Sequence, residues 1–157
     1  MKSTLDSDIK SVQWIKSQLL DGAVKVTALL MIPAFIASVY RAVSVGVKPV
    51  MYLHFIATIG FLFIWLKKQS FSYSLRASIF LVLFYSLGVG GVAQWGFVGL
   101  GVAGLIVFCL LSALLLGKKP ALMATALSLL TLAVIGWLAM TQILVFSIDA
   151  NHYQYQL

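Results

Sequence analysis

Residues 77–117 contain no charged side chain, and this run of 41 residues constrains the fold of the chain more than any other feature. As a single α-helix it would be roughly 62 Å long, about twice the thickness of the hydrocarbon core of a bilayer. The run therefore has to fold back on itself. Glycines are concentrated near its middle, where we expect the turn. We predict two membrane-spanning helices, over about residues 75–93 and 97–117.

The composition excludes a water-soluble domain. Hydrophobic residues make up 62% of the chain and charged residues 10%, with a mean hydropathy of +1.04. Soluble domains have roughly 45–50% apolar and about 25% charged residues. The first 20 residues carry charges and lack an early apolar core, so no cleavable signal peptide is expected. We expect an all-α integral membrane protein with about five transmembrane helices.

The remaining spans are bounded by basic residues and prolines. We place the first span at about residues 24–46, the second at about 50–66 and the fifth at about 121–146. The bundle as a whole covers residues 23–148, followed by a polar extracytoplasmic tail at 149–157.

The N-terminal segment 1–22 is polar and has a helical pattern of apolar residues, namely Ile9, Val12, Ile15 and Leu19. We expect an amphipathic helix that lies in the membrane interface on the cytoplasmic side. The alternative is a short soluble leader helix.

Basic residues are distributed unevenly between the two ends of the expected bundle. Nine of the eleven Lys and Arg residues fall on the side of the N-terminus, and only Arg41 and Lys48 fall on the other side. By the positive-inside rule, the N-terminus is cytoplasmic and the C-terminus extracytoplasmic, in a bacterial cytoplasmic membrane. The net charge of +7 is thus explained by topology, and we expect no nucleic-acid partner.

The sequence contains few groups that could perform catalysis. Three of its four carboxylates lie in the first 21 residues, and the fourth is Asp149. His54, His152 and Asp149 do not form a spaced metal-binding motif, so we expect no enzyme activity, metal or cofactor. Residues 99–104 match the dinucleotide pattern G-x-G-x-x-G, but that pattern requires a βαβ unit. At a membrane hairpin these glycines are better explained by close helix packing.

Polar residues near the expected outer surface indicate a ligand site. Arg41 and His54 lie near the facing ends of the first two spans, which a short loop connects. Ionisable groups at membrane depth are costly and usually face the interior of a bundle. We expect Arg41, Tyr52, His54, Gln94 and Trp95 to bind a small ligand at the outer side. The alternative is that Arg41 extends to the surface and His54 bonds to a backbone carbonyl.

Residues 41–54, R-A-V-S-V-G-V-K-P-V-M-Y-L-H, are similar to a signature of membrane input domains in bacterial sensor proteins. In that family the domain precedes histidine-kinase, PAS or diguanylate-cyclase modules. The similarity extends over about residues 38–138. It includes Arg76-Ala77, the glycine-rich turn at 88–104 and the L-L-L-G-K-K segment at 114–119.

The resemblance implies a sensory input domain, like that of a sensor histidine kinase, that lacks its own catalytic output. Family members normally continue into cytoplasmic signalling domains, whereas this sequence stops at Leu157. We expect either part of a longer sensor or a stand-alone relative. The expected partners are the lipid bilayer, a cytoplasmic signalling domain or protein, and a second copy of the chain in a homodimer. The alternative function is a small accessory subunit of a transporter or another membrane complex.

The charge distribution predicts which loops are accessible from outside the cell. Single cysteines at positions 48 and 151, in a variant without Cys109, should react with an impermeant thiol reagent in intact cells. Cysteines at positions 69 and 118 should react only after lysis. Labelling of position 69 or 118 from outside would contradict the arrangement with five spans and a cytoplasmic N-terminus.

Overall fold

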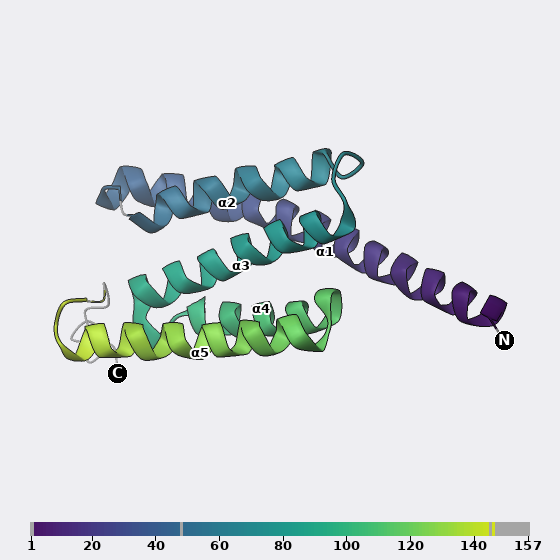
Figure 1. The fold of residues 1–157 in the computed structure, drawn as a ribbon. Coiled ribbons are helices and arrows are strands. Elements are labelled where there is room, and N and C mark those ends of the chain that lie inside the picture. Colours follow the sequence, from purple (N-terminus) through teal and green to yellow (C-terminus); the bar gives the residue numbers. More distant parts are fainter. Residues whose placement is uncertain (1, 48, 145, 147–157) are drawn as a thin grey trace, which may run out of the picture.

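The structure, a computed structural model, describes residues 2–47, 49–144 and 146, and its regular elements are all helices. They are α1 (Lys2–Val45), α2 (Pro49–Leu66), α3 (Tyr73–Trp95), the short 3₁₀ helix η1 (Gly96–Val98), α4 (Leu100–Leu116) and α5 (Lys118–Met140). The long helices lie side by side and alternate in direction, and α1 extends beyond the others at its N-terminal end (Figure 1). This all-helical architecture confirms the predicted all-α fold class.

Four helical segments in the described part of the chain are long and apolar enough to cross a membrane. They belong to α1, α2, α3 and α5, whereas α4 has 17 residues and is about 26 Å long. That length is at the lower limit for a transmembrane helix. The count of five spans therefore stays a prediction.

The first helix differs from the expected division into a leader and a span. It runs without interruption from Lys2 to Val45, through the boundary expected at residue 22. Gly22 lies inside the helix, where a glycine costs only about 1 kcal/mol relative to alanine and does not remove a hydrogen bond. The side chains of Val12, Ile15 and Leu19 are exposed. The interfacial position of this segment stays a prediction.

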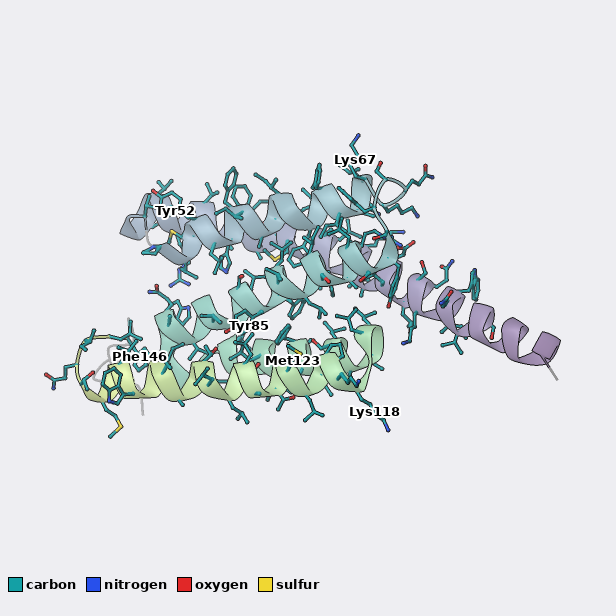
Figure 2. All side chains as sticks on the ribbon, viewed as in Figure 1. Tyr52, Lys67, Tyr85, Lys118, Met123 and Phe146 are labelled. Atoms are coloured by element: carbon teal, nitrogen blue, oxygen red, sulfur yellow. The ribbon has the colours of Figure 1, made fainter. Side chains whose placement is uncertain are left out.

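The last helix ends earlier than predicted. Its last residue is Met140 rather than residue 146, because the chain turns at Thr141 and Gln142 adopts a positive φ of 58°. The chain then returns toward the start of α4, and the Phe146 ring lies 6.5 Å from that of Phe97 in an edge-on contact. Figure 2 shows Phe146 at the same end of the bundle as Tyr52. Asp149 and His152, like the rest of the expected tail, lie outside the described residues.

The closest helix contact is between α3 and α4, where glycines face each other. A Cβ atom on Gly91 would lie 2.8 Å from the Cα of Gly101, and one on Gly101 would overlap the α3 backbone. A Cβ atom on Gly104 would lie 3.3 Å from the Cα of Gly88, and one on Gly88 would lie 2.9 Å from the Leu105 side chain. The turn before α4 begins at Gly96, whose positive φ of 66° favours glycine. The G-x-G-x-x-G segment is thus part of a helix crossing, as predicted.

The largest buried cluster lies between α1, α2 and α3. One face of α1 contributes Leu20, Val24 and Ala28 at helical spacing. Phe61 of α2 packs edge-on against Phe80 of α3, with ring centroids 5.6 Å apart. Most large apolar side chains of the bundle remain exposed on its surface, as expected for a protein whose solvent is lipid.

Hydrogen bonds connect the helices outside this cluster. The Tyr73 hydroxyl donates to the Leu115 carbonyl oxygen at 2.8 Å, and so satisfies an acceptor near the end of α4. The hydroxyls of Tyr85 and Thr131 are 2.5 Å apart and join α3 to α5. Such bonds contribute about 0.6 kcal/mol each in membrane bundles, so packing rather than polarity holds these helices together.

The glycine contact predicts which substitutions destabilise the bundle. Gly91→Ala should lower the stability in detergent by roughly 1–3 kcal/mol, because the added methyl group meets backbone rather than a movable side chain. Gly22→Ala is the matched control, since no atom lies within 4 Å of a Cβ at that position. The measurement is the thermal unfolding midpoint of the purified protein. Equal midpoints for the two variants would show that the α3–α4 contact is not tight.

Candidate functional site

A groove of about 840 Å³ lies where α1 ends, α2 begins, α3 ends and α4 begins. We call it the Arg41 groove. Its polar and aromatic lining residues include Arg41 of α1, His54 of α2 and Trp95 of α3. Most of its remaining wall is apolar, including Met31 and Phe84. Small-molecule sites commonly have this composition, with a few convergent polar groups in an apolar cavity.

The charged group of the groove is positioned by an aromatic ring. The guanidinium carbon of Arg41 lies 5.0 Å from the centroid of the Trp95 ring, which is within the range of a cation–π interaction. No carboxylate pairs with Arg41 among the side chains that the structure describes. No described carboxylate therefore neutralises the charge of the Arg41 guanidinium.

The histidine of the groove is held by a serine on the neighbouring helix. The Nδ1 atom of His54 is 2.7 Å from the hydroxyl oxygen of Ser38, which is buried in α1. This bond uses one ring nitrogen and leaves Nε2 for another partner. The alternative prediction, that His54 bonds to a backbone carbonyl, is replaced by this bond to a side chain.

Much of the groove wall on the α3 and α4 side consists of glycines, together with Val98 and Leu100. Gly101 and Gly104 line it on α4, Gly99 lines it just before that helix, and Gly88 and Gly91 line it on α3. A Cβ atom on Gly99 would lie 2.6 Å from the Cβ of Trp95, so the absence of side chains brings the backbone before α4 close to this residue. A ligand in the groove would contact peptide groups as well as side chains.

The structure brings together three of the five predicted ligand-binding residues, Arg41, His54 and Trp95. Tyr52 has 63% of its surface exposed and is not among the residues that line the groove. Gln94 is next to Trp95 in sequence but is not among the residues that line the groove, and it has an interaction partner of its own. Their roles in binding stay predictions.

Ser38 was not predicted from the sequence. It lies three residues before Arg41 in an apolar segment, and a single serine in a membrane helix carries no distinctive pattern. Helical spacing places Ser38 on the same face of the first span as Arg41. Its pairing with His54, however, depends on how α1 packs against α2.

A second polar cluster, at the opposite end of the bundle, was also missed. Arg76 of α3 is buried, and its Nη1 atom donates to the carboxylate of Asp21 on α1. Its Nη2 atom is 3.4 Å from the Ser17 hydroxyl, and the Lys68 ammonium is 3.9 Å from the same carboxylate. Sequence patterns assigned Asp21 to the leader and Arg76 to a loop. The useful signal was that Asp21 is the only acidic residue between positions 9 and 148.

The groups that line the Arg41 groove are suited to binding a ligand. It combines a cation, a hydrogen-bonding imidazole, an aromatic ring and an apolar wall. In residues 2–47, 49–144 and 146, no group of three His, Cys, Asp or Glu residues is placed to hold a metal ion. A ligand that carries a carboxylate, a phosphate or a polarised carbonyl next to an apolar body matches these groups.

Comparison with known proteins identifies one family. Residues 13–155 match MASE11, a family of membrane-associated sensor domains. The match includes the Arg41 groove and the cluster around Arg76. No curated protein and no solved structure matches this chain.

The hydrogen bond between Ser38 and His54 predicts a specific loss of stability. Ser38→Ala should destabilise the protein by about 1 kcal/mol, because it leaves a half-buried ring nitrogen without its partner. Ser44→Ala is the matched control, since the Ser44 hydroxyl is exposed and bonds only within α1, to Tyr40. Thermal unfolding in detergent measures both variants. If Ser38→Ala melts no lower than Ser44→Ala, the bond does not hold His54 in place.

Proposed function

Because this chain belongs to the MASE11 family of membrane-associated sensor domains, we propose that it receives its stimulus in the Arg41 groove. In this proposal it is the input domain of a bacterial signalling protein, such as a sensor histidine kinase. The kinase or cyclase activity belongs to a separate domain or partner. The domain lies in the cytoplasmic membrane with its N-terminus in the cytoplasm, as the distribution of basic residues predicts.

One observation carries this proposal. The guanidinium of Arg41 is placed over Trp95, beside the Ser38–His54 pair, without a carboxylate among the described side chains to neutralise it. Arg41 is exposed and so is accessible to an acceptor, whereas the buried Arg76 is neutralised by Asp21. The unpaired guanidinium therefore supports a site for an acceptor that comes from outside the chain.

The groove is placed where a ligand would change helix packing. Its walls come from α1, α2, α3 and α4, so a ligand that fits one arrangement of these helices better than another shifts the population toward it. Arg41 lies near the C-terminal end of α1, which is one element of 44 residues from Lys2 to Val45. A displacement at the groove is thus carried along α1 to the other end of the bundle. In a homodimer, the same displacement would occur in both copies and would reach the signalling domain associated with each copy.

A second candidate function has one observation in its favour. An apolar groove of about 640 Å³ lies between α3, α4 and α5, lined by side chains such as Leu81, Phe108 and Met123. This surface supports an accessory subunit that packs against another membrane protein. The neighbouring genes distinguish the two functions, since a kinase or cyclase module favours sensing and a permease or ATPase favours the subunit.

The proposed stimulus site predicts the effect of two substitutions on signalling. Arg41→Ala and His54→Ala should each abolish the response, or raise the stimulus concentration required by roughly tenfold or more, because each removes a bond to the ligand. Arg41→Lys should restore only part of the response, since a point charge does not replace the planar fork of donors. The measurement is signalling output in cells that carry the native gene with each substitution.

Tyr40→Phe serves as the control, because Tyr40 adjoins Arg41, is 74% exposed and does not line the groove. Each variant is first shown to insert into the membrane and to unfold at a temperature close to that of the original protein. A well-folded Arg41→Ala/His54→Ala variant that still signals normally would refute the stimulus site.

A further inference from the structure

A second pocket, of about 250 Å³, lies at the end of the bundle opposite the Arg41 groove. We call it the Arg76 pocket. It is formed by α1, by the end of α2 and by the start of α3, and its charged lining residues are Asp21, Lys25, Lys68 and Arg76. Figure 2 shows Lys67, the neighbour of Lys68, at the same end of the bundle as Lys118.

The charges in the Arg76 pocket do not balance. Three cations, Lys25, Lys68 and Arg76, face one carboxylate, Asp21. Asp21 bonds to Arg76 and lies 3.9 Å from the ammonium of Lys68. The next acidic residue in either direction along the chain is at position 8 or 149. The pocket therefore has an excess of two positive charges and favours an anion.

Arg76 also has an unused donor at this site. Only 7% of its surface is exposed, and its Nε atom is buried without a hydrogen-bond partner among the described residues. Buried donors without a partner are rare in native proteins and call for an explanation. A guanidinium presents five N–H groups in a planar fork that matches the oxygens of a phosphate, and Asp21 and Ser17 occupy only part of that fork.

The position of the pocket along the membrane normal matches that of lipid headgroups. Arg76 directly precedes the uncharged run at 77–117, and Lys68 is the second residue after the apolar helix α2. Trp65 lines the pocket as well, and tryptophan is enriched at the level of the headgroups. The pocket thus lies at the boundary of the apolar part of the bundle.

From these observations we propose that the Arg76 pocket binds a phosphate group, supplied by an anionic phospholipid headgroup or by free phosphate. Lys25 and Lys68 attract the anion, and Arg76 donates hydrogen bonds to it. The bound phosphate bridges α1, α2 and α3 and stabilises their contact. This site is separate from the Arg41 groove, and the proposal does not depend on what the groove senses.

The test measures the thermal unfolding midpoint of the full chain in a neutral detergent. Phosphatidylglycerol, phosphatidylcholine and inorganic phosphate are added in separate titrations. Lys25→Gln/Lys68→Gln removes the excess charge of the pocket and leaves the Asp21–Arg76 pair intact. Lys118→Gln/Lys119→Gln is the matched control, because it removes the same charge from exposed lysines at the same end of the bundle, outside the pocket.

Phosphatidylglycerol should raise the midpoint of the original protein and of the Lys118/Lys119 variant. The Lys25/Lys68 variant should require roughly tenfold more lipid for the same rise, since each basic residue near an anionic headgroup contributes severalfold in affinity. A rise with inorganic phosphate as well identifies any phosphate as the ligand, and a rise with phosphatidylglycerol alone identifies the lipid headgroup.

Two results would overturn the proposal. The first is an equal response of both double variants, which would mean that the lipid acts on the basic surface in general. The second is an equal response of the original protein to phosphatidylcholine and phosphatidylglycerol without any response to phosphate, which would mean that the acyl chains account for the stabilisation. Because neither measurement involves signalling, failure here leaves the Arg41 groove untouched.

Discussion

The approach of α3 to α4 through facing glycines is the contact on which the rest of the structure depends. Without side chains at Gly91 and Gly101, the two backbones meet closely enough for the long uncharged run to fold into a hairpin. In a membrane, apolar side chains gain little by leaving lipid for protein, so close packing replaces the hydrophobic effect as the force between helices. Helix α3 thereby becomes the element that contacts α2 on one side and α4 on the other.

The same glycines shape the Arg41 groove. They also line it, so the residues that form the helix crossing form one wall of the groove as well. The polar groups are concentrated at the two ends of the bundle, with Arg41 and His54 at one end and Asp21 and Arg76 at the other. Helix α1 contributes to both ends, since 20 residues, or about 30 Å of helix, separate Asp21 from Arg41.

Arg76 and Arg41 lie in different environments within the same bundle. Arg76 is buried and neutralised by Asp21, and removing Asp21 would leave the buried charge of Arg76 without compensation. Arg41 is exposed, lies against an aromatic ring and has no carboxylate near it among the described residues. The first arrangement fixes α1 against α3, whereas the second leaves a cation for an external acceptor. A sensor needs both a rigid frame and an open site.

The sequence alone determined that this chain is a helical membrane protein whose uncharged run forms a hairpin, because hydropathy and glycine placement act locally, although the turn lies at residues 96–99 rather than at 93–97. It also placed Arg41, His54 and Trp95 near one surface, since the ends of consecutive antiparallel helices meet there. Only the tertiary structure decided that Ser38 holds His54, that Trp95 lies under Arg41 while Tyr52 faces outward, and that Asp21 reaches Arg76 across 55 positions. Those pairings depend on how each helix is rotated about its axis. That rotation is set by the shapes of side chains packed between helices, which no local pattern along one helix records.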